Sequence, residues 1–105
     1  MKGIAQMTIE EFEEENYLRL SVDGKIDANS CQEFTNAILS ALQRTNSLII
    51  DMENVTYLSS AGLRTFILGQ KTAQSKGSVF SLINVQDPVM GIFHTTGFDK
   101  ILKIS

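Results

Sequence analysis

The sequence has little of what disulfides and metal sites require. Its 105 residues include one cysteine, Cys31, and one histidine, His94. A single cysteine excludes an internal disulfide and is typical of a protein from a reducing compartment. One cysteine and one histidine cannot assemble the clustered ligands of a zinc site. We therefore expect neither a metal site nor a cofactor.

Long apolar runs and basic clusters are also absent. The longest apolar runs are a few residues, whereas a bilayer span needs about 20. The N-terminus lacks the basic region and apolar stretch of a secretion signal. The nine Lys and Arg residues are scattered and the net charge is −3, so no basic stripe could bind a phosphate backbone. We expect a cytoplasmic protein that neither inserts into a membrane nor binds nucleic acid.

The composition is that of one globular domain. The chain is 43% hydrophobic and 20% charged and has one proline, which is typical of a folded protein. Its length suits a single domain with its own core, so we expect residues 1–105 to form one domain. We also expect a monomer, because no coiled-coil seam or apolar tail is visible.

Hydrophobic patterns predict five strands. In residues 17–22 the alternation places Leu18, Leu20 and Val22 on one inward face. The acidic residues just before this run indicate a solvated turn from an earlier strand. Asp51 is expected where the next strand ends, at the carboxyl edge that carries many α/β sites. The later strand-like runs are short and apolar and comprise residues 47–52, 78–85 and 101–105.

Three helices are predicted between these strands. Residues 28–44 have helical spacing, with Asp27 or Asn29 available to accept hydrogen bonds from the first free amides. A second helix follows the serine pair and ends at Gly77, and Gly69 within it suggests close packing against a neighbour. The third helix is expected to have an N-cap, a proline in the first helical position and a terminating glycine, which are Asp87, Pro88 and Gly97.

Strands that alternate with helices imply right-handed crossovers and a largely parallel sheet. The opening pair of strands adds one antiparallel hairpin. The sequence therefore predicts an α/β fold in which helices pack on a mixed sheet as a second layer.

The most informative stretch is NVTYLSSAGLRTFI, residues 54–67, where a strand meets a helix. A serine there can cap the helix by accepting an amide hydrogen from a residue two or three positions on, and one serine is enough for this. The same position lies at the positive end of the helix dipole, where a phosphate is stabilised. A phosphate on Ser60 would add about 1.5 to 2 negative charges and repel an acidic partner surface. Such a group is a switch on binding and not a catalyst.

Three stretches of the sequence carry a resemblance to a known family: GKID at 24–27, LIIDMENVTYLSSAGLR at 48–64 and FHTTGFDKILKI at 93–104. Through these stretches the chain resembles a STAS domain of the bacterial anti-sigma factor antagonist type, from about residue 17 to residue 104. The resemblance implies a mixed sheet of four to five strands with helices packed on one side.

In that family the strand-to-helix junction reads Asp, Ser, Ser or Thr, Gly, Leu, and a partner kinase phosphorylates the first serine. On this sequence Ser59 takes the place of the aspartate and Ser60 that of the phosphoacceptor. The resemblance implies phosphorylation at Ser60, with Ser59 as the second choice. The residues that it implies for partner binding are Asp27, Ser59, Ser60, Ala61, Gly62 and Arg64.

The resemblance also implies the partners. The unphosphorylated protein would bind an anti-sigma factor that is also a serine kinase, and the sigma factor would be released. The kinase would use ATP to phosphorylate Ser60 and break the complex, and a separate serine phosphatase would restore it.

Two other binding functions and an enzyme remain as alternatives. A STAS adaptor in a larger signalling or transporter assembly would use Ser60 only as a helix cap. A small-ligand sensor would hold a nucleotide or a lipid head group at the helix N-terminus. A serine enzyme would need a base beside the hydroxyl, but His94 is the only histidine, and SSAG lacks the first glycine of the G-x-S-x-G motif. We therefore expect no enzyme.

Overall fold

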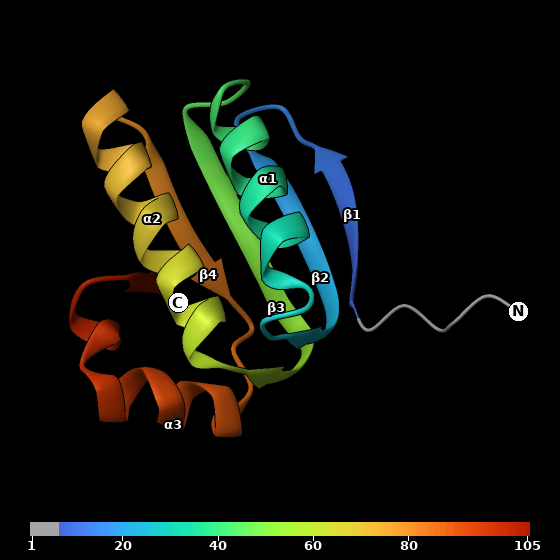
Figure 1. The fold of residues 1–105 in the computed structure, drawn as a ribbon. Coiled ribbons are helices and arrows are strands. Elements are labelled where there is room, and N and C mark those ends of the chain that lie inside the picture. Colours follow the sequence, from blue (N-terminus) through green and yellow to red (C-terminus); the bar gives the residue numbers. More distant parts are fainter. Residues whose placement is uncertain (1–6) are drawn as a thin grey trace, which may run out of the picture.

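The computed structural model describes residues 7–105 (Figure 1). Its elements follow the order that the sequence predicts, with one additional turn of 3-10 helix before the last strand. The strands are β1 (Met7–Glu13), β2 (Leu18–Ile26), β3 (Ser47–Leu58), β4 (Val79–Ile83) and β5 (Lys103–Ile104). The helices are α1 (Cys31–Leu42), α2 (Ser60–Lys76), α3 (Asp87–Thr96) and the 3-10 turn η1 (Phe98–Lys100).

The five strands form one mixed sheet in the order β1-β2-β3-β4-β5. β1 and β2 are an antiparallel hairpin, and each later strand pairs in parallel with the one before it. The predicted mixed sheet is therefore confirmed, with five strands.

Helices α1 and α2 lie side by side over one face of the sheet, and α3 lies across its lower end in Figure 1. Three phenylalanine rings join the helices. The Phe66 ring of α2 meets the Phe34 ring of α1 at a centroid distance of 5.1 Å and the Phe93 ring of α3 at 5.5 Å, both edge to face. Within residues 7–105, no helix combines the length and the hydropathy needed to cross a bilayer.

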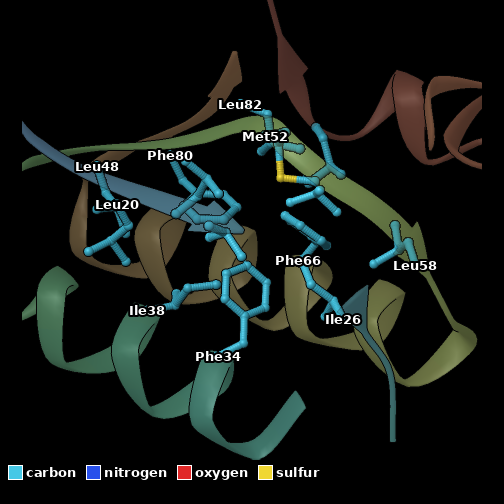
Figure 2. Packing of buried hydrophobic residues seen from close by; sticks show 14 of the residues in the cluster. Leu20, Ile26, Phe34, Ile38, Leu48, Met52, Leu58, Phe66, Phe80 and Leu82 are labelled. Atoms are coloured by element: carbon cyan, nitrogen blue, oxygen red, sulfur yellow. The ribbon is translucent and has the colours of Figure 1, made fainter. Parts of the chain in front are cut away.

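Alternation along the strands builds the core between sheet and helices (Figure 2). Leu20 of β2, Ile50 of β3 and Leu82 of β4 are neighbours in register, and each is at most 1% exposed. The predicted inward face of β2 is confirmed, because Leu18 and Val22 are also buried. At the ends of β2 and β3 the core continues with the buried Ile26 and Leu58, which lie beneath the start of α2.

Gly69 allows α2 to lie close to its neighbours, as the sequence predicts. A Cβ at this position would be 3.0 Å from Cζ of Phe80 and 3.1 Å from Cγ2 of Ile38. Even a methyl group would therefore require β4 and α1 to move slightly.

Several predicted boundaries change in the structure. The first helix begins at Cys31 rather than residue 28, because residues 27–30 form a hydrogen-bonded turn. β4 ends two residues early because Asn84 adopts a left-handed backbone with φ of 58°. Gly77 and Gly97 end α2 and α3 with φ of 72° and 78°, as predicted.

The predicted cap of α3 is wrong by one residue. Gln86 is the N-cap, because its backbone is extended and its carbonyl accepts a hydrogen bond from the Met90 amide at 2.8 Å. Asp87 is therefore the first helical residue and Pro88 the second. A proline is tolerated there because amides of the first helical turn have no partner within the helix.

An exposed ion pair joins β1 to the end of α1. The two terminal guanidinium nitrogens of Arg44, Nη1 and Nη2, donate to the Glu11 carboxylate at 2.6 and 2.7 Å. The hydrogen bond from Arg44 lowers the pKa of the Glu11 carboxyl below its usual value. Both side chains are well exposed, so the pair adds little to stability.

Candidate functional site

The serine junction lies where the ends of β2 and β3 meet the start of α2. Leu58 pairs with Ile26, and the Ser59 amide donates to the Ile26 carbonyl at 2.9 Å. Because Asp27 directly follows Ile26, the loops before α1 and α2 lie at the same end of the sheet. The structure therefore places Asp27 and Ser59 at the same end of the sheet.

The two serines have different roles. Ser59 is the N-cap of α2: its Oγ accepts from the Gly62 amide at 3.4 Å, and its carbonyl accepts from the Leu63 amide at 3.0 Å. Ser60 is the first helical residue and is exposed, and its hydroxyl has no hydrogen-bond partner in the described part of the chain. The interpretation of Ser60 as a helix cap is therefore wrong.

We expect Ser59→Ala to lower the free energy of unfolding by about 1 kcal/mol, because the Gly62 amide loses its acceptor. The matched variant Ser60→Ala should change it by less than about 0.5 kcal/mol, since alanine is the better helix former. Urea denaturation measures both. Equal losses in the two variants would contradict the assignment of Ser59 as the cap.

The small residues after the serines allow α2 to approach the sheet. Gly62 is buried, and a Cβ there would be 2.5 Å from Cδ1 of Leu58 and 2.8 Å from Cγ2 of Ile26. Gly62 therefore lies beneath the surface on which the sequence analysis places it. Ala61 is half-buried beside it, so the exposed part of the junction is Ser60.

The Asp27 carboxylate forms hydrogen bonds within its own loop. Its Oδ1 accepts from the amides of Asn29 at 2.9 Å and Ser30 at 3.2 Å, which belong to the turn before α1. The prediction that Asp27 or Asn29 binds the first free amides of this helix is wrong, because Ser30 is the N-cap and no side chain makes a cap hydrogen bond. The Ser30 hydroxyl in turn donates to the Lys25 carbonyl at 2.7 Å. This network fixes the loop beside Ser59.

Arg64 lies one helical turn after Ser60 and is exposed. Among residues 7–105, its guanidinium forms no ion pair. The predicted docking residues that remain on the surface thus include a cation without an ion pair in the described part of the chain, one helical turn after Ser60.

Asp51 is not part of this site. β3 continues to Leu58, and at about 3.3 Å per residue the seven further residues place Asp51 about 20 Å away. The prediction that the strand ends at Asp51 is therefore wrong. Its carboxylate instead accepts from Arg19 Nη1 at 3.3 Å and from Asn84 Nδ2 at 3.1 Å.

Sequence analysis missed Tyr57 as a surface residue. Its side chain is 48% exposed near the end of β3, next to the inward-facing Leu58. Exposed aromatic side chains are enriched at protein interfaces. Regular alternation along β3 would not have found it, because residues 53, 54, 56 and 57 are exposed whereas Val55 and Leu58 are buried.

Within residues 7–105, His94 forms no hydrogen bond with Ser59 or Ser60. His94 is exposed at the end of α3, and its Nδ1 lies 3.0 Å from Oδ2 of Asp99. In the described residues, no three His, Cys, Asp or Glu side chains gather as metal ligands. A surface hollow of about 590 Å³ lies at the other end of α2, beside Lys76 and the acidic turn after β1.

The sequence profile of the family described as "Mlab, STAS domain" matches residues 10–103. The chain belongs to the STAS domain family. The predicted resemblance is therefore confirmed. The match covers the starts of α1 and α2 and all of β2, β3 and β4.

This STAS domain is similar to curated bacterial proteins along most of its length. It is 26% identical to an anti-sigma-B factor antagonist of Bacillus subtilis (strain 168), covering 87% of this chain and 84% of the relative. It is 27% identical to a STAS-domain containing protein of Pseudomonas aeruginosa (strain UCBPP-PA14), covering 84% of this chain and 87% of the relative. These relatives place this STAS domain near the anti-sigma factor antagonists at modest identity.

Solved structures share the fold. The crystal structure of an anti-sigma factor antagonist from Mycobacterium paratuberculosis matches with a TM-score of 0.85 and 24% identity, over 93% of this chain and 84% of that one. The structure of the Bacillus cell fate determinant SpoIIAA in its phosphorylated form matches with a TM-score of 0.72 and 12% identity. The match covers 93% of this chain and 91% of that one. At these identities the likeness establishes the architecture of this STAS domain.

Proposed function

We propose that this STAS domain is an anti-sigma factor antagonist whose binding to its partner is switched off by phosphorylation of Ser60. The observation that carries the proposal is the division of roles at the junction. Ser59 provides the cap, so the exposed Ser60 hydroxyl is available to a kinase without loss of the helix start. The names of the curated relatives supply the class of partner.

The domain acts as a substrate in this switch and not as a catalyst. The partner, an anti-sigma factor with serine kinase activity, transfers the γ-phosphoryl group of ATP to Ser60 Oγ. The hydroxyl proton is lost to the kinase or to water, and ADP leaves. A separate serine phosphatase hydrolyses the phosphoester and restores the hydroxyl. The unphosphorylated monomer binds the anti-sigma factor in the cytoplasm and thereby releases the sigma factor.

Ser59 replaces the aspartate of the family pattern without loss of the cap. Aspartate and serine are both strong N-cap residues, because each offers an oxygen to the amides of the first turn. The exchange therefore preserves the helix start beneath Ser60 and removes one negative charge beside the acceptor. Ser60 remains the acceptor in this arrangement, because the Ser59 Oγ faces the Gly62 amide.

Phosphorylation changes the charge of the docking surface. A phosphate adds about 1.5 to 2 negative charges, which the amides at the start of α2 stabilise. A partner surface that accommodates a neutral hydroxyl and Arg64 would meet this group with like-charge repulsion and a desolvation penalty. The modified domain therefore dissociates.

We expect Ser60→Asp to weaken partner binding at least about tenfold, equivalent to about 1.4 kcal/mol, while Ser60→Ala binds like the wild type. The partner can be captured from cells with Ser60→Ala as bait, and its affinity for each variant measured by calorimetry. Ser75→Asp is the matched control, because Ser75 is exposed near the other end of α2 and should leave affinity unchanged.

Equal affinity of Ser60→Asp and Ser60→Ala would contradict the switch. Intact-mass measurement of protein from growing cells gives a second readout, with the mass of one phosphate expected on the wild type and not on Ser60→Ala. If the wild-type protein binds its partner but never carries a phosphate in growing cells, the domain is instead a constitutive adaptor.

A further inference from the structure

Arg64 stands apart from the other two arginines of the chain. Arg44 forms a bidentate pair with Glu11, and Arg19 pairs with Asp51 at 3.3 Å. In the part of the chain that the structure describes, Arg64 has no carboxylate partner. Its own helix offers none either, because the α2 sequence SAGLRTFILGQKTAQSK contains no Asp or Glu.

The position of Arg64 relative to Ser60 suits an ion pair along the helix. Both residues are exposed, and they are four positions apart at the start of α2. Side chains at this spacing are neighbours on the helix surface, with about 5–6 Å between their Cβ atoms, and an anion that precedes the cation is the favourable order. The planar guanidinium can donate two parallel hydrogen bonds to two phosphate oxygens.

We propose that the phosphate on Ser60, once attached, is bound within the same helix by the guanidinium of Arg64. This inference rests on the proposed function, which supplies the phosphate, and adds how the switch acts. In the unphosphorylated domain Arg64 is available to a carboxylate on the partner. After phosphorylation Arg64 turns to its own helix, so the partner loses a cationic contact and at the same time meets a new anion.

The inference can be tested without any partner or kinase. Phosphoserine is installed at position 60 during translation, and the second pKa of the phosphate is measured by ³¹P NMR in the otherwise native chain. The ordinary value is about 6. We expect the pKa to be lower with Arg64 than in Arg64→Gln by at least about 0.5 unit, a threefold change in the ionisation constant. Circular dichroism confirms that the variants are folded.

Lys71→Gln is the matched control, because it removes an exposed cation from the same helix at a greater distance from residue 60. The phosphate pKa should be unchanged in this variant. Equal values in wild type and Arg64→Gln would overturn the inference. A rise of the same size in Lys71→Gln would also overturn it, because the effect would then come from the general charge of α2.

A second measurement links the ion pair to binding. Arg64→Gln should weaken partner binding of the unphosphorylated domain, and phosphoserine at position 60 should weaken it less in Arg64→Gln than in the wild type. Fully additive effects would overturn the shared role of Arg64. Failure of the proposed function would look different: no phosphate on Ser60 in cells, with the ³¹P result intact.

Discussion

Gly62→Val is expected to lower the free energy of unfolding by about 3 kcal/mol, at the upper end of the range for overpacked interiors. A Cβ alone would be 2.5 Å from Leu58 Cδ1 and 3.0 Å from the Ile26 carbonyl oxygen, and valine adds two more methyl groups. The start of α2 would have to move away from the ends of β2 and β3. Urea denaturation of the purified domain measures the loss.

Gly91→Val is the matched control for this prediction. Gly91 lies within α3, and a Cβ there would meet no atom within 4 Å. Valine and glycine differ little in helix propensity, so the expected change is within about 0.5 kcal/mol. A Gly62→Val variant of wild-type stability would contradict the packing. If that stable variant failed to bind its partner, Gly62 would belong to the docking surface, as the sequence analysis predicts.

The loss of Gly62 would also affect function indirectly. Ser59 and Ser60 are placed by the hydrogen bond from the Ser59 amide to the Ile26 carbonyl. A shift of α2 breaks the alignment of this bond and turns Ser60 relative to the loop of Asp27. Reduced partner binding in Gly62→Val is therefore expected together with reduced stability.

Phe66→Ala should lower the free energy of unfolding by about 4 kcal/mol. Phe66 is fully buried, and its ring meets Phe34 at 5.1 Å and Phe93 at 5.5 Å, so one side chain joins all three α-helices. Its removal leaves a cavity and ends both edge-to-face contacts. Chemical denaturation with intrinsic tyrosine fluorescence or circular dichroism measures the change.

Phe12→Ala makes the same substitution on the surface. Phe12 is 38% exposed on β1, and its ring lies 4.3 Å from the guanidinium carbon of Arg19. We expect the loss of this exposed cation–π contact to lower the free energy of unfolding by about 0.5–1 kcal/mol. Losses of similar size in Phe12→Ala and Phe66→Ala would contradict the central position of Phe66 in the core.

In this STAS domain the candidate phosphorylation site and part of the hydrophobic core lie on the same helix, α2. The first turn of α2 carries the exposed Ser60, and the next turn carries the buried Phe66. The hydroxyl that a kinase would modify is held in place by residues that also determine stability. Ser60→Ala and Arg64→Gln change only exposed side chains and are for this reason the variants that isolate function.

Local patterns in the sequence were enough to determine the order of the elements. Alternation marks the inward face of β2, helical spacing marks α2, and Gly77 and Gly97 end their helices in the left-handed conformation that glycine tolerates. Each of these features depends on residues close together in the chain. The serine junction was found in the same way, as small and polar residues between a strand and an amphipathic helix.

The tertiary structure alone decided which serine caps α2, how far β3 extends and which way Gly62 faces. β3 runs past Asp51 because β2 pairs with it as far as Leu58, and neither strand's own sequence specifies that partner. Gly62 faces inward because the Leu58 and Ile26 side chains lie beneath it. The pairing of β3 with β2 and the Ile26 side chain beneath Gly62 come from residues distant in the chain, so the sequence near the junction does not specify them.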